Sequence, residues 1–135
     1  MSLFVDTSAW SLAFRRDGRV SAPEAGALVD ALEHGEMIVT TGIVLQELLQ
    51  GFNGPKAREQ LLGRFSALPF VMPERRDHVD AAGLRNTCRR GGLQIATIDA
   101  LLAQLCIRHG LTMLTTDGDF AALARHSRLK LWRNA

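Results

Sequence analysis

Short apolar runs alternate with longer amphipathic stretches along this 135-residue chain, and the alternation limits the folds open to it. The short runs have strand length, whereas the stretches between them repeat apolar side chains at helical spacing. Strands that alternate with helices form a parallel sheet covered on both faces. We therefore expect an α/β fold, a five-stranded parallel sheet flanked by helices, with strands near residues 3–5, 37–40, 70–72, 111–115 and 129–132.

The composition indicates one globular domain over residues 1–135. With 47% hydrophobic and 22% charged residues, the chain has enough apolar material for a core. No apolar run approaches the roughly 18 residues typical of a membrane span, and no secretory signal pattern opens the chain. We expect a cytoplasmic protein that does not associate with a membrane. The net charge of +2 excludes a strongly basic protein, and the two cysteines form no metal-binding cluster.

Five acidic side chains stand where such a fold would bring them together: Asp6, Glu47, Asp99, Asp117 and Asp119. Asp6 and Asp117 each follow a predicted strand, and ligands of open α/β sheets bind at the carboxyl ends of the strands. Several carboxylates gathered there repel one another unless a cation lies among them. The pattern predicts a divalent-metal site, and a metal site at this edge indicates phosphate chemistry.

Each acid also has a purely structural explanation. Asp6 can cap a helix, and Asp99 can be an acid in a first helical turn, where the helix dipole favours it. Asp117 and Asp119 can cap a strand-to-helix turn. Glu47 lies roughly 150° from the apolar stripe of its helix, which by periodicity alone favours a solvated surface position. What favours a shared site is the position of all five acids relative to the predicted strands and helices.

The chain resembles a PIN-domain ribonuclease, and more narrowly a VapC-type toxin of a bacterial toxin–antitoxin pair. The matching pieces agree in order and spacing across nearly the whole chain, and they are residues 5–10, 47–51, 99–103 and 109–120. The resemblance implies an endoribonuclease that cleaves cellular RNA with a metal-activated water. It further implies a homodimer that a VapB-like antitoxin protein neutralises.

The resemblance also assigns roles to single residues. It implies that four acids coordinate Mg²⁺ or Mn²⁺ and carry catalysis, namely Asp6, Glu47, Asp99 and Asp117, with Asp119 as a fifth candidate ligand. For Glu47 it overrides the surface position that periodicity favours. The hydroxyl residues Thr7, Ser8 and Thr116 stand beside these acids in the sequence, where they are candidates to support the ligands by hydrogen bonding.

Three arginines lie on a predicted helix that ends before the helix of Asp99: Arg85, Arg89 and Arg90. Arg85 and Arg89 are spaced i, i+4 and share a face, so all three are candidates to hold RNA phosphates near the metal. The alternative is an ordinary solvated face.

Two other function classes remain open from the sequence. A phosphoacceptor receiver module has a similar length and an acidic metal site, and Lys130 on the last predicted strand matches its lysine. Against it, the first strand is followed by one acid rather than a pair. The second alternative is a non-catalytic domain that binds RNA or an antitoxin.

Overall fold

The computed structural model describes residues 1–15 and 22–133, which form one parallel sheet and the helices around it. The strands are β1 (Leu3–Val5), β2 (Ile38–Val39), β3 (Thr112–Leu114) and β4 (Lys130–Leu131), in the order β2-β1-β3-β4. All three strand pairs are parallel. The predicted α/β class with a parallel sheet flanked by helices is confirmed.

The expected strand count is corrected from five to four within the described residues. The segment 70–72 contributes one isolated parallel bridge, between Thr40 and Phe70. It lies between Pro69 and Pro73, and a proline has no N–H to donate and restricts the residue before it. These two prolines explain why the segment pairs at a single point beside β2 and does not continue as a strand.

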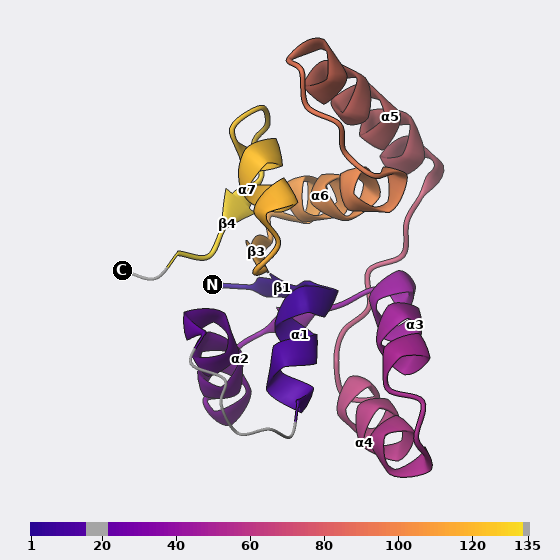
Figure 1. Ribbon diagram of the computed structural model, residues 1–135, viewed down its shortest axis with the longest axis vertical. Coiled ribbons are helices and arrows are strands. Elements are labelled where there is room, and N and C mark those ends of the chain that lie inside the picture. Colours follow the sequence, from indigo (N-terminus) through magenta and orange to yellow (C-terminus); the bar gives the residue numbers. More distant parts are fainter. Residues whose placement is uncertain (16–21, 134–135) are drawn as a thin grey trace.

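Seven helices connect the strands in the described part of the chain: α1 (Thr7–Phe14), α2 (Pro23–Glu33), α3 (Gly42–Gly51), α4 (Pro55–Phe65), α5 (Arg75–Arg90), α6 (Thr97–His109) and α7 (Gly118–Ala124). Figure 1 shows α5, α6 and α7 in the half of the molecule with β3 and β4, and α1 to α4 in the other half. Gly110 ends α6 in the left-handed region at φ 65°, which turns the chain directly into β3.

The central strands are buried on both faces, which explains their unbroken apolar sequences. Leu3, Phe4 and Val5 of β1 are at most 1% exposed, and Met113 and Leu114 of β3 are fully buried. A strand covered on both faces has no solvent side and therefore needs no polar alternation. The first polar residue after β1 is thus held at the end of a rigid, fully packed element.

A buried ion pair joins α5 to α6. Asp77 is fully buried and accepts a hydrogen bond of 2.7 Å from Arg108 Nη2 and one of 2.8 Å from the backbone N–H of Glu74. The hydrogen bond from Arg108 lowers the pKa of Asp77 below its usual value. The pair fixes α6 against α5, and α6 carries Asp99 at its opposite end.

None of the helices within residues 1–15 and 22–133 combines the length and apolarity that crossing a membrane requires.

Candidate metal centre

The strand order reverses beside β1, and this reversal defines the candidate site. The chain leaves β1 through α1 and α2 to reach β2 on one side, then travels through α3 to α6 to reach β3 on the other side. In open α/β sheets, ligands bind in the crevice at the carboxyl ends of the strands beside such a reversal. Val5 pairs with Leu114 in register, so Asp6 and Thr115, the next residues, emerge side by side at this edge.

Three of the predicted acids form a compact group. One carboxylate oxygen from each of Asp99, Asp117 and Asp119 lies within 4.8 Å of the other two. Asp99 is in the first turn of α6, and Asp117 is the N-cap of α7. Asp117 Oδ1 accepts a hydrogen bond of 2.9 Å from the backbone N–H of Asp119, which is exposed. Asp119, the fifth-ranked acid in the sequence analysis, therefore belongs to the tightest part of the group.

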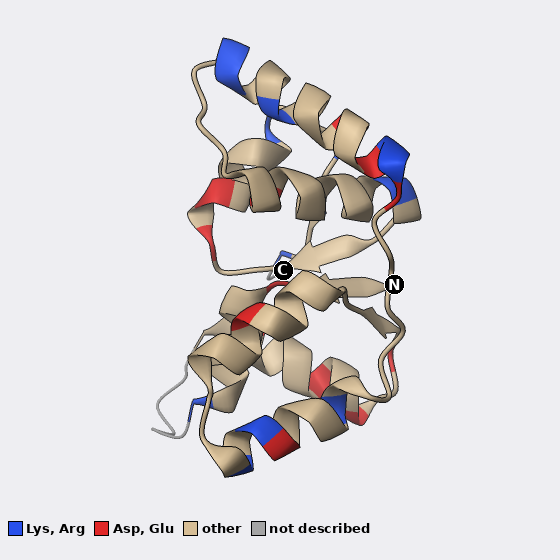
Figure 2. Ribbon diagram, turned by 90° about the vertical axis from the view of Figure 1, so that its right-hand side faces the viewer, with Lys and Arg blue, Asp and Glu red and all other residues tan. Residues whose placement is uncertain are grey.

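The remaining two acids act on the same carboxyl group electrostatically. Burial, followed by the negative charges of Asp117, Asp6, Asp119 and Glu47, raises the pKa of Asp99 to about 6. All five acids therefore share one electrostatic environment, although only three have oxygens within 4.8 Å of one another. Such a set of carboxylate oxygens suits a small, hard divalent cation such as Mg²⁺ or Mn²⁺. Figure 2 shows acidic segments from both halves of the molecule along one side, at the level of the sheet.

Glu47 does not occupy the surface position that helical periodicity favours. It is half-buried on α3, and its Oε1 accepts a hydrogen bond of 3.0 Å from Thr7 Oγ1, in the first turn of α1. The single-stripe calculation is wrong here because α3 packs against both α1 and α4. Its apolar residues therefore cover more than one face, and an acid opposite one stripe still points toward a neighbouring element.

The carboxylate of Asp6 is buried within a small hydroxyl network. Asp6 Oδ2 accepts hydrogen bonds from Ser8 Oγ at 2.8 Å and from Thr115 Oγ1 at 2.9 Å. The backbone N–H of Ser8 also reaches Oδ2, at 3.4 Å. The predicted supporting residues Thr7 and Ser8 thus contact Glu47 and Asp6 respectively.

Thr115, rather than the predicted Thr116, supplies the hydroxyl on the β3 side of this network. Thr116 is exposed and reaches the network through its backbone N–H, which donates to Ser8 Oγ at 3.0 Å. Thr115 was not among the predicted supporting residues. The signal was its position, because Thr115 follows β3 in the register at which Asp6 follows β1.

The three predicted RNA-binding arginines differ in their environments. Arg85 is half-buried, and its Nε donates a hydrogen bond of 2.7 Å to the carbonyl of Ile95, just before α6. Arg89 and Arg90 are exposed and bond to side chains of their own helix, Asn86 and Thr87. Arg85 is therefore turned toward the segment that leads to Asp99, and the i, i+4 pair does not form one uniform solvated row.

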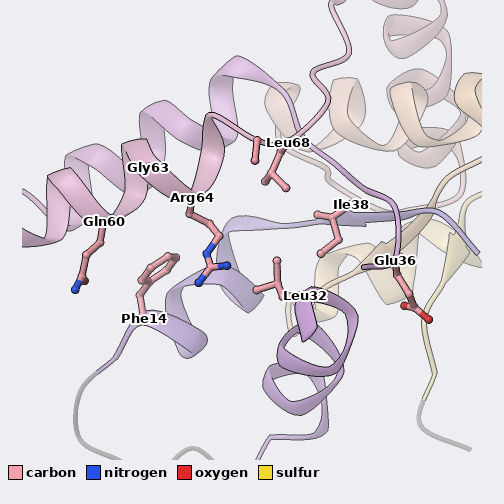
Figure 3. Close-up of a pocket in the computed structure, with 9 residues that line it drawn as sticks. Phe14, Leu32, Glu36, Ile38, Gln60, Gly63, Arg64 and Leu68 are labelled. Atoms are coloured by element: carbon pink, nitrogen blue, oxygen red, sulfur yellow. The ribbon is translucent and has the colours of Figure 1, made fainter. Parts of the chain in front are cut away.

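A cavity of about 700 Å³ lies away from the acids, between α1, α2, β2 and α4. Figure 3 shows Arg64 of α4 extending into it between Phe14 and Leu32. None of the five candidate ligands lines this cavity. The candidate site is therefore the acidic edge of the sheet and not this hollow, although the hollow has a large volume.

Comparison with known proteins gives a consistent family. The sequence matches the family described as PIN domain over residues 3–126. It is 32% identical over 132 residues to the VapC ribonuclease Mb1587 of Mycobacterium bovis, covering 95% of this chain and 96% of that protein. Ribonuclease VapC11 of Mycobacterium tuberculosis matches with the same identity and coverage. The structure of VapBC2 from Rickettsia felis bound to a promoter DNA fragment has a TM-score of 0.73, with 22% identity and 100% coverage of both chains.

Proposed function

The chain belongs to the PIN domain family, and from this premise we propose that it is a toxin that cleaves cellular RNA as an Mg²⁺- or Mn²⁺-dependent endoribonuclease. The curated relatives at 32% identity, named as VapC ribonucleases, support the reaction class. A family match over residues 3–126 sets aside the receiver interpretation, and the clustered acids argue against a non-catalytic binding domain.

One observation carries the metal dependence. Asp99, Asp117 and Asp119 bring carboxylate oxygens within 4.8 Å of one another, and the charges of Asp6 and Glu47 act on the same place. Carboxylates so close repel one another strongly unless a cation neutralises them. Building such a group into a folded protein lowers its stability, so a cation that binds there offsets the repulsion.

The proposed roles follow from these positions. Asp6, Glu47, Asp99 and Asp117 would hold the cation, with Asp119 as an additional exposed ligand. A bound cation would supply an activated water and stabilise the charge that develops on the phosphate during hydrolysis. Asp99 must be ionised to act as a ligand, and its pKa of about 6 makes its protonation compete with metal binding in mildly acidic solution.

We propose that Arg85 binds the RNA backbone beside this site. Its Nε is held by the carbonyl of Ile95, so the guanidinium loses little freedom when it contacts a phosphate. Arg89 and Arg90 lie further along α5 and would contribute more general electrostatic attraction.

The proposed partners are a second copy of the chain and a VapB-like antitoxin. The metal-free edge carries a strongly negative potential, which a basic side chain from the antitoxin can neutralise by pairing with the carboxylates. Arg suits this contact because its planar fork matches carboxylate geometry. A toxin that acts on cellular RNA works in the cytoplasm, and we propose that location.

A cleavage assay with single variants tests the function. We expect purified wild-type protein to cut RNA with Mg²⁺ or Mn²⁺, to lose activity in EDTA, and not to recover with Ca²⁺, which prefers a larger and looser site. Asp99→Asn should abolish cleavage. The matched control Asp30→Asn, on the exposed surface of α2, should cleave at the wild-type rate. Undiminished cleavage after thorough chelation would refute the proposal.

A further inference from the structure

Thr115 stands at the junction of two candidate ligand segments. Its Oγ1 donates a hydrogen bond of 2.9 Å to Asp6 Oδ2 and accepts one of 3.0 Å from the backbone N–H of Asp117. The first bond reaches a carboxylate at the end of β1, and the second fixes the turn that leads into α7. One hydroxyl therefore joins two acids that are far apart in the sequence.

The protons of this network can be assigned by counting donors. Ser8 and Thr115 each have one hydroxyl proton, and Asp6 Oδ2 lies within 2.9 Å of both oxygens. Each hydroxyl also accepts a backbone N–H, from Thr116 and from Asp117 respectively. If both hydroxyl protons point to Oδ2, every group is satisfied, and the 3.1 Å contact between Ser8 Oγ and Thr115 Oγ1 needs no proton of its own.

This arrangement fixes which oxygen of Asp6 faces a ligand. The hydrogen bonds that reach the Asp6 side chain within the described residues all end on Oδ2. A backbone N–H that donates to a hydroxyl polarises it, and the hydrogen bond from that hydroxyl to the carboxylate becomes stronger. With Oδ2 held in this way, Oδ1 is the oxygen left for a cation, and the carboxylate cannot rotate without breaking the bonds from both hydroxyls.

We propose that Thr115 is a positioning residue of the metal centre, which holds Asp6 and the Asp117 turn in the mutual geometry that a divalent cation needs. The inference rests on the proposed function, because it concerns the same carboxylates. The hydroxyl proton of Thr115 is used by Asp6 and one of its lone pairs by Asp117.

The test is Mn²⁺ affinity, measured by calorimetry on the full-length protein without RNA. We expect Thr115→Val, which keeps the shape but removes the hydroxyl, to weaken Mn²⁺ binding by about 10- to 100-fold, as losses of groups that orient metal ligands do. Thr115→Ser should bind within about threefold of wild type, because its hydroxyl restores both bonds. Thr112→Val, the same change on a half-buried β3 residue at the other end of the strand, should leave the affinity unchanged.

Further readouts separate positioning from simple destabilisation. Metal binding is measured well below the Tm of each variant, so a loss of affinity reports on the site. At saturating metal, Thr115→Val should recover much of its kcat with an unchanged KM for RNA. If Thr115→Val does not fold, Ser8→Ala, which removes the other donor to Asp6 Oδ2, should weaken Mn²⁺ binding in the same range.

The outcomes are distinguishable. Wild-type affinity in Thr115→Val, or equal losses in Thr115→Val and Thr115→Ser, would overturn the positioning role while leaving the proposed ribonuclease intact. Mn²⁺ binding by wild-type protein without RNA cleavage would overturn the proposed function and leave the positioning role standing. No Mn²⁺ binding by wild-type protein would overturn both.

Discussion

Thr7 donates a hydrogen bond of 3.0 Å to Glu47 across a sequence separation of 40 residues, which ties the first turn of α1 to the middle of α3. The contact places a hydroxyl from the turn that follows Asp6 against the acid that helical periodicity assigns to the surface. Together with the bonds of Ser8 and Thr115 to Asp6, it shows that short hydroxyl side chains orient the acids from both sides of the site.

Substitutions of Thr7 and of Glu47 should distinguish the effect of losing the Glu47 charge from the effect of losing its orientation. Glu47→Gln keeps an oxygen that can accept from Thr7 but removes the charge, so we expect cleavage to fall by about 100-fold or more through loss of a metal ligand. Thr7→Val should lower Mn²⁺ affinity by only about 10-fold, because the carboxylate remains and loses only its orientation. Cleavage rates measured across a Mn²⁺ titration distinguish the two variants. Equal losses of activity in both would contradict the assignment of Glu47 as a ligand and Thr7 as the residue that orients it.

Removal of the Asp99 charge should stabilise the metal-free protein. Its folded pKa of about 6 lies above the ordinary value of 3.8, so folding disfavours the ionised form. The associated stability is complete below pH 3.8 and is lost as the pH rises through about 6. In EDTA at pH 7.5, the free energy of unfolding of Asp99→Asn should exceed that of wild type by about 1 kcal/mol, a figure reduced for solvent screening.

Urea denaturation at pH 4 and pH 7.5 measures this difference. The advantage of Asp99→Asn should appear between these values and should shrink when Mn²⁺ is added to the wild type. If Asp99→Asn is less stable than wild type at pH 7.5 in EDTA, then burial and repulsion of the charged carboxylate do not dominate at this position.

The buried Asp77 should have the opposite pH dependence. Its folded pKa is lowered, first by the hydrogen bond from Arg108, so its contribution to stability is present above pH 3.8 and lost as the pH falls through the folded value. Asp77→Asn keeps an oxygen for the Glu74 N–H but loses the charge. We expect a decrease of about 1 kcal/mol in the free energy of unfolding at pH 7, and a smaller one at pH 3. An equal decrease at both pH values would contradict the charge-based account.

Arg85 should contribute more to RNA binding than its neighbours on α5. Arg85→Ala should raise KM with little change in kcat and reduce the dependence of KM on salt, since each lost phosphate contact lowers that slope by about 0.7 for a single strand. Arg89→Ala is the matched control from the exposed end of the helix and should have a smaller effect. Cleavage measured against RNA concentration at two ionic strengths checks this. An unchanged slope for Arg85→Ala would favour a purely structural role for its bond to Ile95.

The antitoxin should compete with the metal if it neutralises the acidic edge. Calorimetric titration of the toxin with its antitoxin at low and at saturating Mg²⁺, at matched ionic strength, measures this competition. Weaker binding at high Mg²⁺ is expected, because both ligands use the same carboxylates. An affinity that is indifferent to Mg²⁺ would place the inhibitory contact elsewhere.

The fold could be predicted from the sequence where the local pattern of apolar residues agrees with the packing. The run at residues 3–5 is β1, and the run at 111–115 contains β3, because the apolar residues of both runs are buried. The run at 70–72 has the same apolar character, yet its flanking prolines limit it to one bridge. Short apolar runs carry no information about how far a ladder continues, so the count of strands could not be derived from them.

The site was only partly accessible. Asp6 and Asp117 are readable because they follow strands, but Glu47 lies on a helix whose buried surface extends over more than one face, which a single-stripe analysis does not capture. Thr115 was missed because a hydroxyl has no periodic signature, and its position beside Asp6 follows from the register of β1 and β3. The ion pair of Asp77 and Arg108 depends likewise on how α5 crosses α6, which no local pattern specifies.

The most direct test of the central claim, that these acids hold the catalytic cation, is an anomalous difference map at the manganese absorption edge from crystals of the wild-type protein grown with Mn²⁺. A peak is expected among the carboxylates of Asp99, Asp117 and Asp119, on the side that faces Asp6, at oxygen distances close to the roughly 2.0–2.1 Å of Mg²⁺. A map with no peak at this edge of the sheet, or with manganese bound only elsewhere, would contradict the account.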